Sequence, residues 1–175
     1  QLVSEGLIRA YGWSTDDPTR AKVFADGANC VAIQHQQNIF EDNHPMITFL
    51  EQQSLSSINR GPLGMGILTG KFSNGSTLES TDIRHVSPEW MAYFKNGQPN
   101  PIWLAKLEAI REILCADGRS LTQGALGWLL ARSDKTIPIP GFRTVKQVEE
   151  NAKTLELGAL SQQQMQQIAQ LLKVV

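Results

Sequence analysis

Asn29-Cys30-Val31-Ala32-Ile33-Gln34 is a short, almost wholly apolar run, and the helix-like segment Pro45 to Gln53 follows it. Its four central residues are apolar without alternation, which is typical of a strand buried on both faces in a parallel sheet that helices cover. Neighbouring parallel strands need a helical crossover between them. If this interpretation is right, the same strand-then-helix unit has to recur along the chain.

A first copy of the unit precedes this run. The stretch Leu7 to Trp13 predicts a strand, and Ser14, Thr15 and Asp16 then offer side chains that can cap a helix. Pro18 suits the first turn of that helix because its missing N–H has no partner there in any case.

Two more units follow. Leu55 to Arg60 predicts a third strand, and Lys135 to Ile139 predicts a fourth that leads into a helix from Thr144 to about Leu155. Four such units in series predict an α/β fold with a parallel sheet.

Further helices are predicted over residues 102–116 and 121–132, and a C-terminal packing helix over 161–173. Ser120, Thr144 and Ser161 each have Gln three residues later, which is the capping-box arrangement at a helix start. We expect residues 1–175 to form a single unit.

Residues 72–101 form a long loop insert between the third and fourth strands, rich in Gly, Asn, Ser and Pro. Loops of this length commonly cover a site or are flexible. The aromatic residues Trp90, Tyr93 and Phe94, with Trp103 beyond them, either form an apolar wall or pin the loop to the body.

Composition excludes several function classes. With 16 Lys and Arg against 17 Asp and Glu, the net charge is −1, so no nucleic-acid partner is indicated. No apolar run approaches the ~20 residues that cross a bilayer, and the first residues lack signal-peptide features, so we expect a cytoplasmic protein without a membrane contact. Cys30 and Cys115 are predicted to be free thiols, because no CxxC spacing suggests a disulfide framework or a metal site.

The glycine-rich stretch Asn59 to Lys71 follows the third strand directly. Four glycines let its backbone approach an anion closely, and Lys71 adds a positive charge, so a phosphate group is a natural ligand. The stretch matches neither GxxxxGK[ST] nor GxGxxG. A flexible surface turn and a phosphate-binding loop both fit it.

The stretch Ile137 to Thr144 follows the fourth strand. It ends in Pro140-Gly141, after which Arg143 stands beside a helix that Thr144 caps. A guanidinium and a helix N-terminus at one corner suit a phosphate monoester. The alternative is that Thr144 and Gln147 only cap the helix and that Arg143 is solvated.

Taken in order, these two stretches, together with Gly6 to Ser14 and with Gln34 and Asn38, resemble the C-terminal half of an aldo-keto reductase, from its fifth strand to its end. The resemblance implies a (β/α)8 TIM-type barrel that binds NADPH and transfers a hydride to a carbonyl. It implies no metal. The chain itself is shorter than the ~250 residues of a complete barrel.

Residue by residue, the resemblance assigns contacts along an extended cofactor. Ser14 and Gln34 would bond the nicotinamide carboxamide, and Arg60 would stack on its ring, where many members have an aromatic residue. The pyrophosphate would be lined by Leu63, Gly66, Thr69 and Lys71. The adenosine end would be held by Gly141, Phe142 and Arg143 at the ribose and its 2′-phosphate, and by Gln147, Glu150 and Asn151 around the adenine.

Three positions depart from the family pattern. Thr15 stands where Asn is common, Gln37 where an aromatic residue is common, and Gln147 where many members carry an Arg. The last departure weakens the preference for the phosphorylated cofactor. Gln147 also has a second role in the capping box, and one side chain is not expected to serve both.

The family's catalytic Tyr, Lys, Asp and His belong to segments before the matched region, so no catalytic residue is assigned. Tyr11 and Tyr93 lack the motif context, and His35, His44 and His85 are predicted to be structural or surface residues. A half barrel of about four strands would expose two sheet edges, so it should need the missing N-terminal half or a second copy.

The leading hypothesis is the NADP-binding half of a reductase that acts on a small-molecule aldehyde or ketone, inactive as this chain alone. The first alternative is a non-catalytic half-barrel protein that self-associates or regulates a partner. The second is an unrelated α/β phosphate binder.

Overall fold

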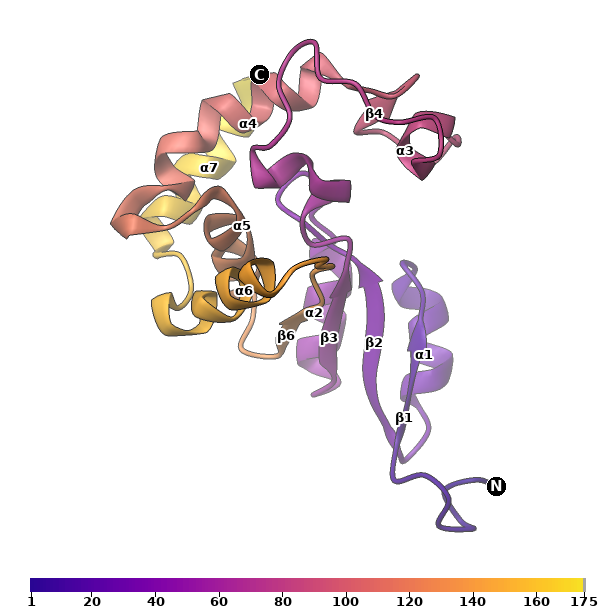
Figure 1. The fold of residues 1–175 in the computed structure, drawn as a ribbon. Coiled ribbons are helices and arrows are strands. Elements are labelled where there is room, and N and C mark those ends of the chain that lie inside the picture. Colours follow the sequence, from indigo (N-terminus) through magenta and orange to yellow (C-terminus); the bar gives the residue numbers. More distant parts are fainter. Residues whose placement is uncertain (175) are drawn as a thin grey trace.

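The computed structural model describes residues 1–174 and contains a four-stranded parallel sheet in the order β1-β2-β3-β6 (Figure 1). All three strand pairs are parallel. The strands span β1 Tyr11–Ser14, β2 Cys30–Gln36, β3 Ser56–Arg60 and β6 Thr136–Pro138. The predicted α/β class with a parallel sheet is therefore confirmed.

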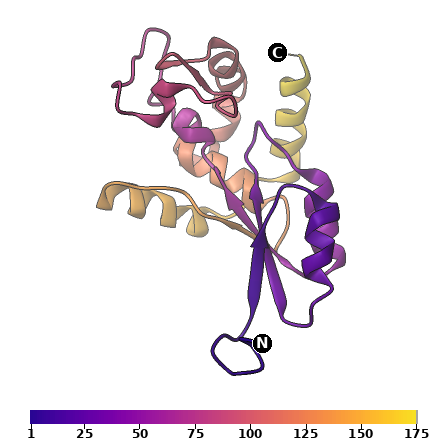
Figure 2. The same ribbon diagram turned by 90° about the vertical axis from the view of Figure 1, so that its right-hand side faces the viewer.

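Two helices cover one face of this sheet: α1 (Pro18–Ala25) and α2 (His44–Gln52) (Figure 2). They enclose a small core with the strands, formed by Ala21, Cys30, Ile33, Met46, Leu50 and Leu55. The opposite face carries alternate side chains of the same strands, among them Gln34 and Arg60.

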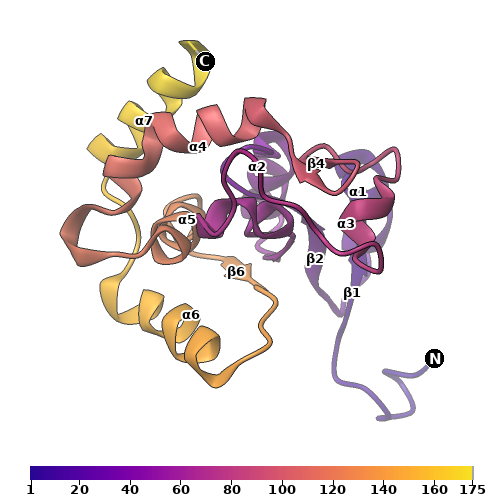
Figure 3. The same ribbon diagram turned by 45° about the horizontal axis from the view of Figure 1, so that its top comes forward.

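A larger core lies beside the sheet, between three helices: α4 (Pro101–Leu114), α5 (Leu121–Leu130) and α7 (Gln162–Val174) (Figure 3). Leu107, Ile110, Leu129 and Ile168 are at most 1% exposed there. Helix α5 is buried on almost every side, as its nearly continuous apolar sequence requires. Helix α6 (Val145–Leu157) contacts α5 and completes this half of the molecule.

The predicted helix starts agree with the observed caps. The Ser120 hydroxyl accepts the Gln123 N–H at 3.2 Å, while the Gln123 side chain accepts the Ser120 N–H at 2.9 Å. The same pair of bonds joins Thr144 to Gln147 and Ser161 to Gln164. Each bond satisfies an N–H at a helix start that has no partner within the helix.

The first unit departs from expectation at both of its boundaries. The strand begins at Tyr11 rather than Leu7, which is 68% exposed. The cap of α1 is Asp17 and not one of residues 14–16, because Asp17 directly precedes Pro18 and accepts the Thr19 N–H at 2.8 Å.

The insert is more ordered than a loop. It contains the short helix α3 (Ile83–Val86) and a hairpin of β4 (Phe94–Lys95) and β5 (Gln98–Pro99). Tyr93 and Phe94 are buried and hold the insert to the body, whereas Trp90 is 63% exposed and does not.

The two cysteines are free, with Cys30 buried and Cys115 partly buried. Within residues 1–174, no helix is long and apolar enough to cross a bilayer.

Candidate functional site

The glycine-rich stretch after β3 folds into the irregular 3-10 segment η1 (Gly64–Thr69). Gly66 has a φ of +93°, a backbone conformation that residues with a side chain rarely adopt. The Thr69 hydroxyl donates a hydrogen bond to the Gly66 carbonyl oxygen at 2.8 Å. Ile67 and Leu68 are fully buried beneath the turn. These two side chains anchor the segment to the core.

This loop and the stretch after β6 line one hollow of about 410 Å³. Leu63, Gly66, Thr69 and Lys71 come from the first stretch, and Gly141, Phe142, Arg143 and Gln147 come from the second. Strands β3 and β6 are neighbours in the sheet, so the segments that follow them emerge side by side. Eight of the thirteen predicted site residues thus share one surface.

Positive charge is concentrated on this hollow. Partial burial, followed by the neighbouring charges of Arg84 and Arg143, lowers the pKa of Lys71. Asp82 also lines the hollow and is ion-paired with Arg84, whose hydrogen bonds hold the pKa of Asp82 well below its usual range. Among residues 1–174, neither Lys71 nor Arg143 has an ion-pair partner, so an anion would find two free cations here.

Arg84 and Asp82 were not predicted from the sequence. They belong to the 72–101 insert, where no periodicity or motif indicated a helix, and only the folded chain carries α3 to the hollow. The Arg84 guanidinium donates to the Met65 carbonyl oxygen at 3.0 Å, which fixes the insert against η1.

Of its two predicted roles, cofactor contact and helix capping, the Gln147 side chain takes the capping role. Its Oε1 atom accepts the Arg143 N–H at 2.7 Å and the Thr144 N–H at 3.3 Å. The carbonyl oxygen of this side chain is therefore not available to a ligand without breaking the cap.

Ser14, Gln34 and Arg60 lie at the carboxyl ends of β1, β2 and β3 and share the face opposite α1 and α2. Ser14 Oγ donates to Gln34 Oε1 at 3.4 Å. Arg60 lines a second hollow of about 500 Å³ with Asp16, Gln36, Glu41 and Tyr93.

Gly61 and Met65 line both hollows, so the two hollows are adjacent. An extended ligand with phosphates at Lys71 and Arg143 would reach Arg60 by passing these two residues. The arrangement suits a dinucleotide.

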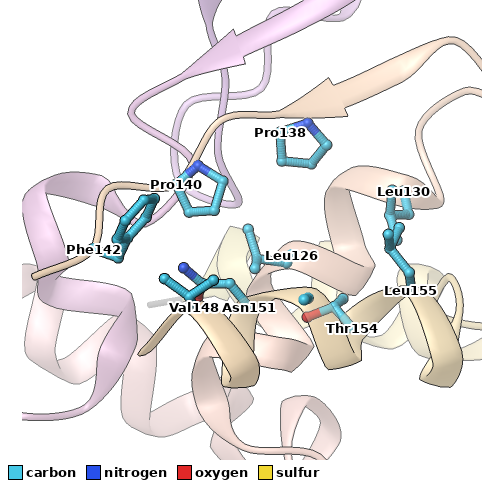
Figure 4. A pocket seen from close by; sticks show the side chains of 10 residues that line it. Leu126, Leu130, Pro138, Pro140, Phe142, Val148, Asn151, Thr154 and Leu155 are labelled. Atoms are coloured by element: carbon cyan, nitrogen blue, oxygen red, sulfur yellow. The ribbon is translucent and has the colours of Figure 1, made fainter. Parts of the chain in front are cut away.

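Four predicted residues line neither of these two hollows: Ser14, Gln34, Glu150 and Asn151. Asn151 lines a separate apolar groove of about 290 Å³ between β6 and α6, together with Pro138, Pro140 and Thr154 (Figure 4). Glu150 lines none of these hollows, and its backbone carbonyl accepts the Gln123 amide at 3.1 Å. Among the described residues, Phe142 alone lines both the hollow with Lys71 and Arg143 and this apolar groove.

The tyrosine and histidine side chains have structural partners. The Tyr93 hydroxyl bonds Asn38 and Glu41, and burial, then Glu41, raises the pKa of Tyr93 far above its usual range. His35 is buried and bonds Ser57 Oγ at 2.8 Å. His44 contacts Arg132 at 3.1 Å, and His85 contacts the Leu78 carbonyl oxygen at 3.1 Å.

The sequence profile of the Aldo/keto reductase family matches residues 1–173. The chain belongs to the aldo-keto reductase family. This membership excludes the alternative of an unrelated phosphate-binding α/β protein.

Curated aldo-keto reductase relatives are moderately similar. "Aldo-keto reductase yakc [NADP(+)]" of Schizosaccharomyces pombe is 27% identical over 90% of this chain and 46% of its own length. "Pyridoxal reductase, chloroplastic" of Arabidopsis thaliana is 27% identical over 95% of this chain and 44% of its own. The chain spans about half the length of the curated relatives it matches.

Solved structures agree on the aldo-keto reductase fold. A glycerol dehydrogenase from Gluconobacter oxydans superposes with a TM-score of 0.82 at 24% identity, over 99% of this chain and 51% of that protein. An aldo-keto reductase from Bacillus halodurans in its holo form gives 0.69 at 26% identity, over 97% and 52%.

Proposed function

We propose that this chain forms the NADP(H)-binding part of an aldo-keto reductase that reduces an aldehyde or a ketone. The observation that carries the proposal is the convergence of two stretches, after β3 and after β6, on one hollow with Lys71 and Arg143 and no ion-pair partner for either within residues 1–174. The relative in Schizosaccharomyces pombe carries NADP(+) in its name, and a solved neighbour is described as complexed with NADPH.

The residues present fit such a cofactor in charge and shape. Lys71 and Arg143, with Arg84 beside them, match the negative charge of a pyrophosphate and a 2′-phosphate. Gly66 leaves room at η1, since a Cβ there would lie 3.4 Å from the Arg84 guanidinium and 3.6 Å from Lys71 Cε.

In this proposal Leu63, Gly66, Thr69 and Lys71 contact the pyrophosphate, while Gly141, Phe142 and Arg143 hold the adenosine ribose and its phosphate. Ser14 and Gln34 orient the nicotinamide carboxamide, and Arg60 lies against the ring. Around the adenine we keep Glu150 and Asn151, with Gln147 restricted to its amide nitrogen because its oxygen serves the cap. When bound, the reduced nicotinamide supplies a hydride to the substrate carbonyl carbon.

We assign no catalytic residue within this chain. The hydroxyl of Tyr93 is unsuited to donate a proton, because it is buried and bonded to the Glu41 carboxylate. We therefore propose that the 175-residue chain binds cofactor without turnover and represents one half of a barrel.

Calorimetric titration of the chain with NADPH tests the proposal. Arg143→Gln should weaken binding about tenfold or more, and it should weaken NADPH binding more than NADH binding, since only NADPH has the 2′-phosphate. Lys153→Gln, on helix α6, removes an equal charge away from the hollow and should change the affinity for neither cofactor. Absence of heat at millimolar NADPH would overturn the proposal.

A second candidate is a non-catalytic protein that associates through its open sheet. The observation in its favour is that the sheet ends at β1 and at β6, with Ile137 48% exposed and Ile139 45% exposed beside the β6 edge. Light scattering after size exclusion distinguishes the two. A stable dimer that does not bind NADPH favours the second candidate, and a monomer that binds NADPH favours the first.

A further inference from the structure

Arg60 is held on two sides by groups that the predicted cofactor site did not include. Its Nη1 atom donates to Gln36 Oε1 at 2.9 Å, and its Nη2 atom forms an ion pair with Asp16 Oδ2. Asp16 is itself fixed, since its Oδ1 atom accepts the Gln36 N–H at 2.6 Å. These bonds set the plane of the guanidinium while its side chain stays 38% exposed to the hollow.

Asp16 reaches this position from the segment between β1 and α1. The sequence offered it as a possible helix cap, but Asp17 occupies the cap and leaves the Asp16 carboxylate free to face β2 and β3. Glu41 also lines this hollow, but its carboxylate accepts hydrogen bonds from Gln36, Asn38 and Tyr93 and is not the ion-pair partner of Arg60. The ion pair is therefore specific to Asp16 and Arg60.

The pair lies where the proposed cofactor would place its redox-active ring. With phosphates at Lys71 and Arg143, an extended dinucleotide passes Gly61 and Met65 and ends at Arg60. The inference below rests on that proposed function. It concerns only the charge that this chain presents to the ring.

The two forms of the ring differ in charge, because the oxidised nicotinamide is a cation and the reduced one is neutral. A lone guanidinium against the ring would repel the oxidised form and leave the reduced form almost unaffected. A carboxylate paired with that guanidinium cancels most of this difference in affinity between the oxidised and the reduced ring.

We propose that Asp16 is a specificity-determining residue that neutralises Arg60 and so sets the preference of the site between oxidised and reduced cofactor. Gln36 acts with it as a positioning residue, since it bonds both members of the pair. Arg60 then offers a flat, polarisable surface without a net positive charge.

The test is the ratio of the dissociation constants of NADP⁺ and NADPH, measured by titration of the full chain. Asp16→Asn keeps the shape and the acceptor oxygen but removes the charge, and it should raise this ratio about five- to tenfold. Arg60→Gln should lower the ratio, and the double variant should return close to the unmodified value. The shift for Asp16→Asn should shrink in 1 M salt, because exposed charges are screened there.

Asp26→Asn is the matched control. It makes the same chemical change at the C-cap of α1, outside both hollows, and should leave the ratio unchanged. If all variants bind both cofactors with the ratio of the unmodified chain, the inference is wrong and the proposed function stands. If the unmodified chain binds neither cofactor, the proposed function fails and the inference fails with it.

Discussion

Lys71, two residues after η1, and Arg143, before α6, line the same hollow, and the Arg143 guanidinium adds to the effects of burial and Arg84 that lower the pKa of Lys71. Two like charges are held together there without an ion-pair partner for either among residues 1–174. Such an arrangement costs free energy in the empty protein and becomes favourable when an anion binds.

An ordinary lysine loses its proton near pH ~10.4. Because the pKa of Lys71 is lowered, its proton should be lost at a lower pH, and NADPH binding should weaken as the pH rises through that lower range. The sign follows from the lowered pKa, since the protonated amine binds the anion and the neutral amine does not. Lys71→Met should weaken binding about tenfold at neutral pH and flatten this pH profile. Titrations at several pH values check both, with Lys153→Met as the control that keeps the profile.

Stability should fall in mild acid because of His35. Desolvation by burial lowers the pKa of His35, so the unfolded chain binds the proton more readily than the folded chain. The contribution of neutral His35 to the free energy of unfolding is therefore fully present above the unfolded pKa of about 6.5. It decreases as the pH falls below that value, by up to about 1.4 kcal/mol per pH unit.

Urea denaturation between pH 7.5 and 5 measures this slope. In His35→Gln the part of the slope below pH 6.5 should be smaller than in the unmodified chain. Equal slopes in the two proteins would show that His35 does not titrate on unfolding.

Much of the architecture could be predicted because its signals are local. Capping boxes such as Ser120 with Gln123, and apolar runs such as 30–33, depend on residues near one another in the chain. The place of Asp82 and Arg84 at the hollow, and the pair of Asp16 with Arg60, could not be predicted, because they depend on contacts between segments far apart in the sequence. The exposed position of Trp90 was missed for the same reason, since burial of an aromatic residue depends on what packs over it.

The insert should depend in part on the buried hydroxyl of Tyr93. Tyr93 is 3% exposed, and its hydroxyl bonds Asn38 and Glu41 below the second hollow. Tyr93→Phe leaves these groups short of a partner and should lower the free energy of unfolding by about 1–3 kcal/mol. Urea denaturation measures the loss, and Tyr11→Phe, whose hydroxyl makes a single long bond of 3.4 Å to the Phe24 carbonyl, should cost less.

A side chain at Gly66 should have two separable effects. Its φ of +93° strains any L residue, and a Cβ would lie 3.4 Å from the Arg84 guanidinium and 3.6 Å from Lys71 Cε, at the anion hollow. Gly75 has a similar φ of +88° but nothing within 4 Å of the added Cβ, so Gly75→Ala isolates the backbone strain. Each alanine should destabilise the fold by about 1 kcal/mol through strain. Only Gly66→Ala should also weaken NADPH binding, because only there does the methyl group occupy space at the cations. Thermal unfolding and titration of both variants check this, and equal cofactor affinity in the two would mean that η1 does not approach the phosphates.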